Sequence, residues 1–201
     1  MTTYAWPDWG VSSFELRVVP NLRTFTSPYG TGQQTLDLLG ERWRLRLQVA
    51  ATNKSIEGAA REAFIDRLKG QSHTFAIWHL RLPAPQGTLR SDGGAPVLDA
   101  AVAQLSNLAV IRTQAGRTVR AGDMLGLAGQ LVRVMADATA NGAGLLAIEF
   151  QPRARTAWGA GSAVQWDKPT ANFMIMTADG APTTWTAAAA DAMALDAVEV
   201  P

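Results

Sequence analysis

A strictly alternating run, Arg42–Val49, constrains this chain more than any other stretch of its sequence. In RWRLRLQV the odd-numbered positions hold tryptophan, two leucines and valine, whereas the even-numbered positions hold Arg42, Arg44, Arg46 and a glutamine. A period of two is typical of a β-strand that buries one face. We therefore predict a strand that lines a core, with three guanidinium groups on its other face within about 14 Å, at about 3.4 Å per residue.

Residues 34–38 alternate as well, and Gly40 with Glu41 follows where the chain could reverse, so the two runs predict a hairpin. Its arginines have two interpretations. They are simply solvated and partly paired with Asp37 or Glu41 across the hairpin, as surface charges need no special purpose. Alternatively, they contact an acidic partner surface, because the planar fork of arginine pairs with carboxylate or phosphate in a bidentate way. The sequence leaves both interpretations open.

Composition excludes several classes of protein. The 201 residues include no cysteine, which rules out disulfides, thiolate chemistry and most structural zinc sites. A net charge of +1 gives no general nucleic-acid signature. The start of the chain lacks a signal-peptide pattern, and no apolar run approaches the roughly 18 residues of a membrane helix. We expect a soluble protein, made in a cytoplasm and not inserted in a membrane.

One helix is expected, beginning at a cap on Asn53 or Ser55 and ending at Lys69 before Gly70. Its apolar residues follow helical spacing and many are small alanines, so the helix should lie close against a sheet. The stripe expected to be buried consists of Ile56, Ala59, Ala60, Ala63, Phe64 and Leu68.

Short strands separated by turn signals make up the remainder, which predicts a mainly β, α+β chain. We expect an N-terminal part (1–82), a loop rich in proline and glycine (83–96), and a small β-barrel-like C-terminal part (97–201), unless all three form one continuous domain. Residues 21–32 are expected to be a loop anchored by Phe25 and Tyr29. Further strands are expected at 13–19, 74–80, 97–105, 108–112, 123–127, 130–135, 145–150, 163–166, 172–177 and 194–200.

No constellation of residues indicates catalysis. The only histidines, His73 and His79, are six residues apart on one predicted strand and too far apart to share an ion. We therefore expect no catalytic, cofactor-binding or metal-binding residues. Tryptophans 158, 166 and 185 offer the remaining possibility, a carbohydrate-binding face, which would require them to be exposed.

Both ends of the chain carry side chains suited to contacts. Trp6 and Trp9 are costly to leave in water, which favours packing on a partner or on the chain itself. After Lys168 the chain has acidic residues and no basic one. This acidic tail, with Asp191, Asp196 and Glu199, could meet the basic front half of a neighbouring copy.

Several runs taken together, in order, resemble tail-tip proteins of bacteriophages with long flexible tails, including Mu-like transposable phages that carry such tails. No single run is specific, but the set covers nearly the whole chain. The runs are 20–28 (PNLRTFTSP), 34–35 (QT), 40–43 (GERW), 68–70 (LKG), 85–88 (PQGT), 121–123 (AGD), 152–153 (PR) and 161–164 (GSAV).

This resemblance implies a structural virion protein, most like a distal tail protein of the tail tip and baseplate. Such a protein has a sandwich- or barrel-like β domain that forms a ring, expected to be a hexamer. The ring joins the tail tube protein to the baseplate hub and fibre proteins and lets DNA pass through its lumen. Some members have a second β domain facing outward, and a receptor- or carbohydrate-binding module is the alternative role.

Ring subunits bind head to tail, so each copy needs two different complementary surfaces. The arginine-bearing run and the acidic tail are the expected pair. The candidate interface residues are Trp6, Trp9, Arg23, Phe25, Arg42, Arg44, Arg46, Asp191, Asp196 and Glu199.

Overall fold

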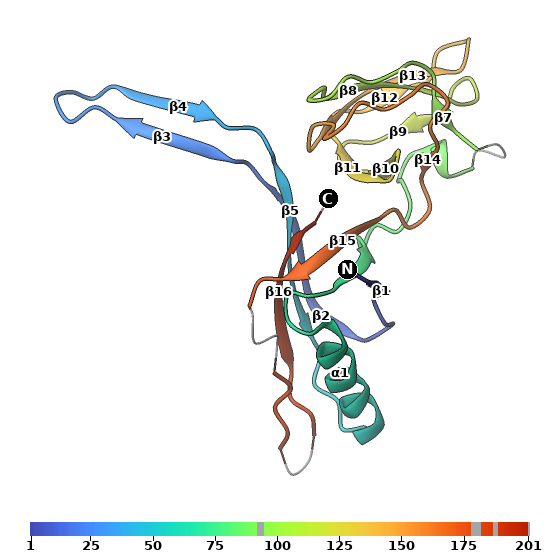
Figure 1. The fold of residues 1–201 in the computed structure, drawn as a ribbon. Helices are drawn as coiled ribbons and strands as arrows, with labels where there is room; N and C mark the ends of the chain where they lie inside the picture. The colour runs from blue at the N-terminus through green and yellow to red at the C-terminus, as the bar shows by residue number, and fades with distance from the viewer. Residues whose placement is uncertain (92–94, 178–181, 187–188, 201) are drawn as a thin grey trace.

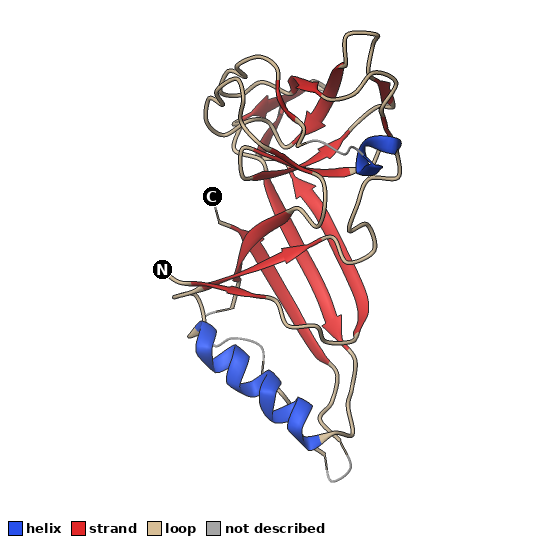
Figure 2. Ribbon diagram, turned by 90° about the vertical axis from the view of Figure 1, so that its right-hand side faces the viewer, coloured by secondary structure: helices blue, strands red, loops and turns tan. Residues whose placement is uncertain are grey.

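The structure is a computed structural model that describes residues 1–91, 95–177, 182–186 and 189–200 (Figure 1). These residues form two six-stranded sheets and, within the described ranges, a single α-helix. The expectation of a mainly β, α+β chain is therefore confirmed. Figure 2 shows the barrel formed by the second sheet at one end of the first sheet and the helix toward the other end.

The first sheet has the order β1-β6-β15-β16-β5-β2, with β1 parallel to β6 and the other pairs antiparallel. Strand β5 is the predicted alternating run, and Trp43, Leu45 and Leu47 are buried on its inner face as expected. Cross-strand pairing continues this apolar face through all six strands. The strands are β1 (Thr3–Ala5), β2 (Val11–Val19), β5 (Arg42–Val49), β6 (Thr74–Trp78), β15 (Thr170–Ile175) and β16 (Met193–Glu199).

Helix α1 (Ser55–Leu68) connects β5 to β6 and covers the inner face with Phe64, Ile65 and Leu68. The predicted cap is wrong, because the capping position is Lys54, which makes no side-chain capping hydrogen bond. The C-terminal end agrees with prediction, since Lys69 adopts a left-handed φ of 48° and ends the helix.

The buried stripe of α1 also differs from the predicted one. Ile56 is 85% exposed, and the alanines of the predicted stripe are exposed as well. Arg61 instead points inward, where its guanidinium donates to the carbonyl of Ala50 at 2.6 Å. Gly58 faces Trp185 so closely that a Cβ would lie 2.3 Å from the indole. These two contacts determine which side of the helix faces the sheet. The alanines do not, because burying a methyl group on one side or the other changes the free energy little.

The second sheet, β14-β10-β11-β13-β8-β7, curls into a nearly closed barrel. Its first and last strands meet through a bridge between Val97 and Ala163, and the amide of Leu98 donates to the carbonyl of Ser162 at 2.9 Å. Its strands are β7 (Val97–Leu98), β8 (Leu108–Arg112), β10 (Met124–Leu127), β11 (Gln130–Val134), β13 (Leu145–Gln151) and β14 (Val164–Gln165), and the small pair β9 (Thr118–Val119) with β12 (Ala138–Thr139) lies beside them.

The barrel is an insertion between β6 and β15, so the expected C-terminal part 97–201 is not one unit. Strands β15 and β16 return to the first sheet, where they pair with β6 and β5. The spacing of apolar residues within β15 and β16 could not reveal this, because these strands pair with strands about a hundred positions earlier in the chain. The predicted loop 83–96 holds a short 3₁₀ helix, η1 (Thr88–Ser91), and residues 92–94 lie outside the described residues.

Direct contacts hold the barrel on the first sheet. The indole Nε1 of Trp43 donates to the carbonyl of Leu131 at 2.9 Å, and the guanidinium of Arg133 donates to the carbonyl of Leu16 at 2.9 Å. That guanidinium also lies 5.0 Å from the centre of a Trp43 ring. Met124 and Leu131 therefore belong to the core of the first sheet rather than to that of the barrel.

The predicted hairpin between 34–38 and 42–49 is wrong. Strand β4 (Gln33–Asp37) pairs with β3 (Leu22–Thr26), a segment that we expected to be a loop, and β5 pairs with β2. The chain only bends at Leu39 and Gly40, both of which have positive φ. β2–β3 and β4–β5 thus form one long, bent hairpin whose far half projects away from the rest of the molecule (Figure 1).

Candidate interface surfaces

The outer face of the first sheet, which carries Arg42, Arg44 and Arg46, is covered by no other segment that the structure describes. A hollow of about 690 Å³ on this face is lined by Arg44, Arg46 and Met176, among others. A second hollow, of about 420 Å³, lies beside Arg42 at the base of the far half of the hairpin. The outer face is thus an open, arginine-rich surface.

Of the acidic tail, Asp196 lies on this same face rather than on a separate surface. Strand β16 runs beside β5, and the Oδ1 of Asp196 accepts from the Nε of Arg46 at 2.8 Å within one chain. On β2, which lies on the other side of β5, Glu15 pairs with Arg17 of the same strand at 3.2 Å. The face is therefore partly neutralised internally, but by other acids than the predicted Asp37 or Glu41.

The two N-terminal tryptophans pack on the chain itself, which is one of the two expected alternatives. Trp6 is buried in the first core, where its ring lies 5.7 Å from Phe64, so it is not a surface contact. Trp9 is half-buried, with its ring 5.2 Å from Trp6. The chain thus covers its own aromatic terminus, because the two indoles and the helix side chain fill one space.

Glu199 is also buried, which corrects its assignment to a surface. Its carboxylate accepts from the backbone amide of Trp43 at 3.0 Å and from both terminal nitrogens of Arg155, one of them at 2.9 Å. A buried carboxylate needs such partners to offset its desolvation. Asp191, at the other end of the tail, is half-exposed, and its amide donates to the carbonyl of Thr184.

The far half of the hairpin, comprising β3, β4 and the turn between them, is a projecting arm. Every residue of both strands is exposed, including Phe25 (55%) and Leu36 (50%), and Tyr29 at the tip is 97% exposed. An isolated two-stranded hairpin is at best marginally stable in water. The arm therefore exposes apolar side chains that no described segment covers.

Contacts at its base fix the direction of the arm. The guanidinium of Arg153, from the barrel, donates to Asp37 at 2.8 Å and lies 3.7 Å from Glu41. The amide of Leu39 donates to the same Asp37 carboxylate at 2.9 Å. These hydrogen bonds, first from Leu39 and then from Arg153, hold the pKa of Asp37 below its ordinary value of 3.8.

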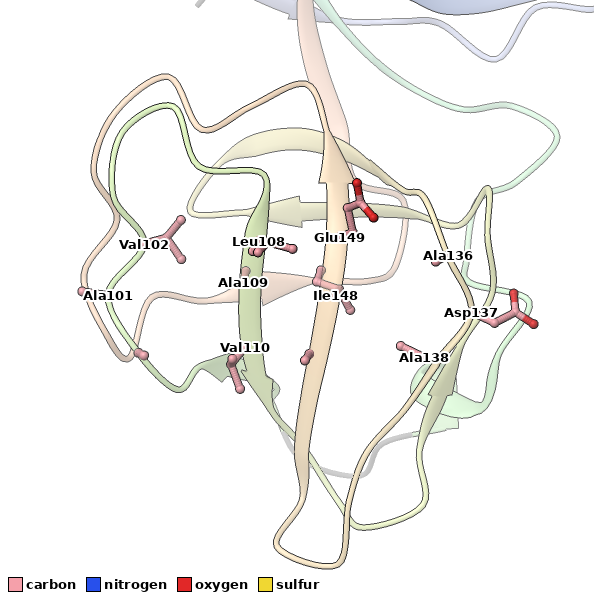
Figure 3. Close-up of a pocket in the computed structure, with 12 residues that line it drawn as sticks. Ala101, Val102, Leu108, Ala109, Val110, Ala136, Asp137, Ala138, Ile148 and Glu149 are labelled. Carbon is pink, nitrogen blue, oxygen red and sulfur yellow. The ribbon is translucent and has the colours of Figure 1, made fainter.

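A groove on the barrel was missed by the sequence analysis. It lies over β8 and β13, has a volume of about 450 Å³, and is lined mostly by alanines and by Leu108 and Val110, with Asp137 and Glu149 at its rim (Figure 3). Leu108 is 61% exposed, although it belongs to a barrel strand. The sequence does contain one sign of this groove, because every position from 108 to 111 is apolar. A strand with only one buried face would alternate between apolar and polar residues, so the run indicates apolar side chains on both faces.

The tryptophans that could have lined a sugar platform do not gather on the surface. Trp158 is buried and stacks on Phe150 at 5.6 Å, and Trp166 packs against the barrel core. Trp185 is exposed, but its Nε1 donates to Glu62 of the helix. In the described part of the chain, no three histidine, aspartate or glutamate side chains gather as a metal site would require.

The chain matches no protein-family model, and comparison with curated protein sequences gives no significant match. No helix within the described ranges is long and apolar enough to cross a lipid bilayer.

Proposed function

We propose that this chain is a structural subunit of a phage tail tip, a ring-forming protein of the distal tail type. In this role it binds copies of itself and joins the tail tube to the baseplate or fibres, and the lumen of the ring lets DNA pass. It performs no chemistry. The protein acts in the virion after synthesis in the host cytoplasm.

The arm is the observation that carries this proposal. It extends a hairpin of the first sheet beyond the body of the subunit and exposes Phe25, Leu36 and Tyr29 together. A segment with no core of its own is stabilised when a neighbouring molecule covers it, which is the situation of a subunit inside an assembly. The ordered runs that resemble tail-tip proteins, several of them at the arm and its base, supply the identity of that assembly.

The outer face of the first sheet supports the same role. It leaves Arg42 and Arg44 without an acidic partner among the described residues, next to a hollow at the base of the arm. Arginines on a flat sheet face suit an acidic protein surface, since guanidinium groups pair with carboxylates in a bidentate way. This face is the proposed seat of the next protein of the tail tip.

Replacing the arm tests the proposal. A variant in which residues 22–37 give way to a two-residue Asn-Gly turn keeps the base contact in which the amide of Leu38 donates to the carbonyl of Asn21. We expect the intact chain to form a closed oligomer by mass measurement and the variant to stay monomeric. Its tryptophan circular dichroism bands should be unchanged, since no tryptophan lies within residues 22–37. Immunogold labelling should place the intact chain at the tail tip. A chain that is monomeric both in solution and in the particle would refute the proposal.

A further inference from the structure

One face of the arm combines two large apolar side chains with a single cation. The register of β3 and β4 places Arg23 opposite Leu36 and Phe25 opposite Gln34, so these four side chains share a face. The opposite face is mostly threonine and glutamine. An exposed face of this composition suits an apolar groove with an acid at its edge.

The barrel groove has the complementary composition. Its lining includes Leu108, Val110 and Ala147. Glu149 projects beside it from β13 (Figure 3). The carboxylate of Glu149 has one weak contact, from the amide of Asn107 at 3.4 Å, and no ion pair within the described residues. The groove thus offers apolar surface and one carboxylate whose charge is not neutralised.

We propose that the arm of one copy docks in the barrel groove of the next copy, with Phe25 and Leu36 on the apolar floor and Arg23 beside Glu149. This inference rests on the proposed function, because it requires that copies of the chain assemble. The occupant is a second copy because the arm projects away from its own barrel (Figure 1) and Arg153 holds its base in that direction.

Charge decides between the groove and the other open surface. On the outer face of the first sheet, Arg23 would lie near Arg42 and Arg44, while the acids there already pair with Arg17 and Arg46. In the groove it meets Glu149, since the other rim acid, Asp137, pairs with Arg120 at 2.6 Å. Charges of like sign repel and charges of unlike sign attract most strongly where water is excluded. The arm should therefore bind in the groove rather than on the outer face of the first sheet.

Arm and groove are different patches of one subunit, which makes the contact heterologous. Each copy then gives its arm to one neighbour and receives an arm from the other, and the contact repeats around an axis until the ring closes. The barrel is therefore an assembly element of the ring, not an outward-facing appendage.

Crosslinking tests the contact directly because the chain contains no cysteine. A Phe25→Cys chain is mixed with an Ala147→Cys chain and treated with a short bis-maleimide. We expect a crosslinked heterodimer. The matched control is Thr24→Cys, one residue away on the opposite face of the arm, which should give little product with the same partner.

Charge exchange provides a second measurement. Arg23→Glu and Glu149→Arg should each raise the dissociation constant of self-association about threefold to fivefold, and the double variant should restore it. Sedimentation velocity at a series of concentrations measures this. Oligomers that form normally but crosslink equally through either arm face, with no rescue by the double variant, would refute the docking alone. A chain that stays monomeric in every form would refute the proposed function and the docking together.

Discussion

The two halves of the long hairpin are both antiparallel strand pairs, but only one of them has a buried face. In the near half, β2 with β5, the apolar face is sealed by α1 and by Met124 and Leu131 of the barrel. In the far half, β3 with β4, Phe25 and Leu36 share one face and remain exposed. The comparison teaches that alternation determines which side chains share a face, whereas other segments determine whether that face is buried.

The largest expected effect tests this difference at one aromatic residue in each half. Trp43→Ala removes a fully buried ring, the hydrogen bond to Leu131 and the contact with Arg133. We expect the free energy of unfolding to fall by about 3–5 kcal/mol. Phe25→Ala, the control in the arm, should change it by less than about 0.5 kcal/mol. Urea denaturation of dilute protein measures both, and equal effects would show that the two halves do not differ.

A slightly smaller effect is expected from the buried ion pair behind the near half. Arg155→Met leaves the Glu199 carboxylate buried with only the Trp43 amide as partner. We expect a loss of about 3 kcal/mol, partly recovered when Glu199→Gln is added, because a buried unpaired charge is costly.

The matched control for the ion pair is Arg46→Met, which breaks the exposed pair with Asp196 on the outer face. Exposed pairs contribute about 1 kcal/mol at most, so this variant should be nearly neutral in chemical denaturation. Equal losses for Arg155→Met and Arg46→Met would contradict the assignment of burial as the cause.

A moderate, pH-dependent effect is expected where the near half meets the barrel. His79 stacks edge-on against Phe14 at 5.1 Å, and its Nδ1 accepts from the amide of Leu82 at 3.1 Å. Burial, and then the charge of Arg133, lower the pKa of His79 below its ordinary value of 6.5. The unfolded chain therefore binds a proton more readily than the folded one.

Stability should accordingly be constant above about pH 7 and fall as the pH drops below 6.5 toward the lowered pKa. The His79→Gln variant should show a flatter profile over this range in urea denaturation between pH 8 and pH 5.5. The arm should contribute nothing to the slope, because its Asp37 titrates below 3.8. An identical slope in the variant would remove His79 as the cause.

The smallest effect on stability is expected at the base of the arm, where a substitution should instead change how firmly the direction of the arm is held. Arg153→Met removes the contacts with Asp37 and Glu41 but changes the free energy of unfolding by only about 0.5 kcal/mol, because the pair is partly exposed. Spin labels at Tyr29→Cys and Ala115→Cys should report a broader distance distribution by pulsed electron resonance. Arg120→Met, which breaks another barrel ion pair, should leave the distribution unchanged.

Much of the near half could be predicted from sequence because its information is local. The alternation of β5 and the end of α1 before Gly70 follow from neighbouring residues. The pairing of β3 with β4 could not, because threonine, serine, proline and glycine between residues 24 and 32 are typical of a loop. Nothing local shows that the stretch continues a longer strand.

The candidate surfaces were harder to predict because burial depends on distant partners. Glu199 looked like part of an acidic exterior, but Arg155 and the Trp43 amide enclose it. For Trp6 the sequence left open packing on a partner or on the chain itself, and the helix settles this by supplying Phe64. Arg42, Arg44 and Arg46 lie on the predicted face, since the alternation that predicted it needs no distant residue.

The point at which the barrel joins the first sheet has a consequence for how such a chain can change over time. Trp78 and Thr170 pair across β6 and β15, so the polypeptide leaves the sheet and returns to it at adjacent positions. A module of another size can replace the barrel by a single exchange of gene sequence without altering any strand pairing in the host sheet. The substitute must still cover Trp43 and supply a cation for the buried Glu199 carboxylate, and these requirements limit which modules the site accepts.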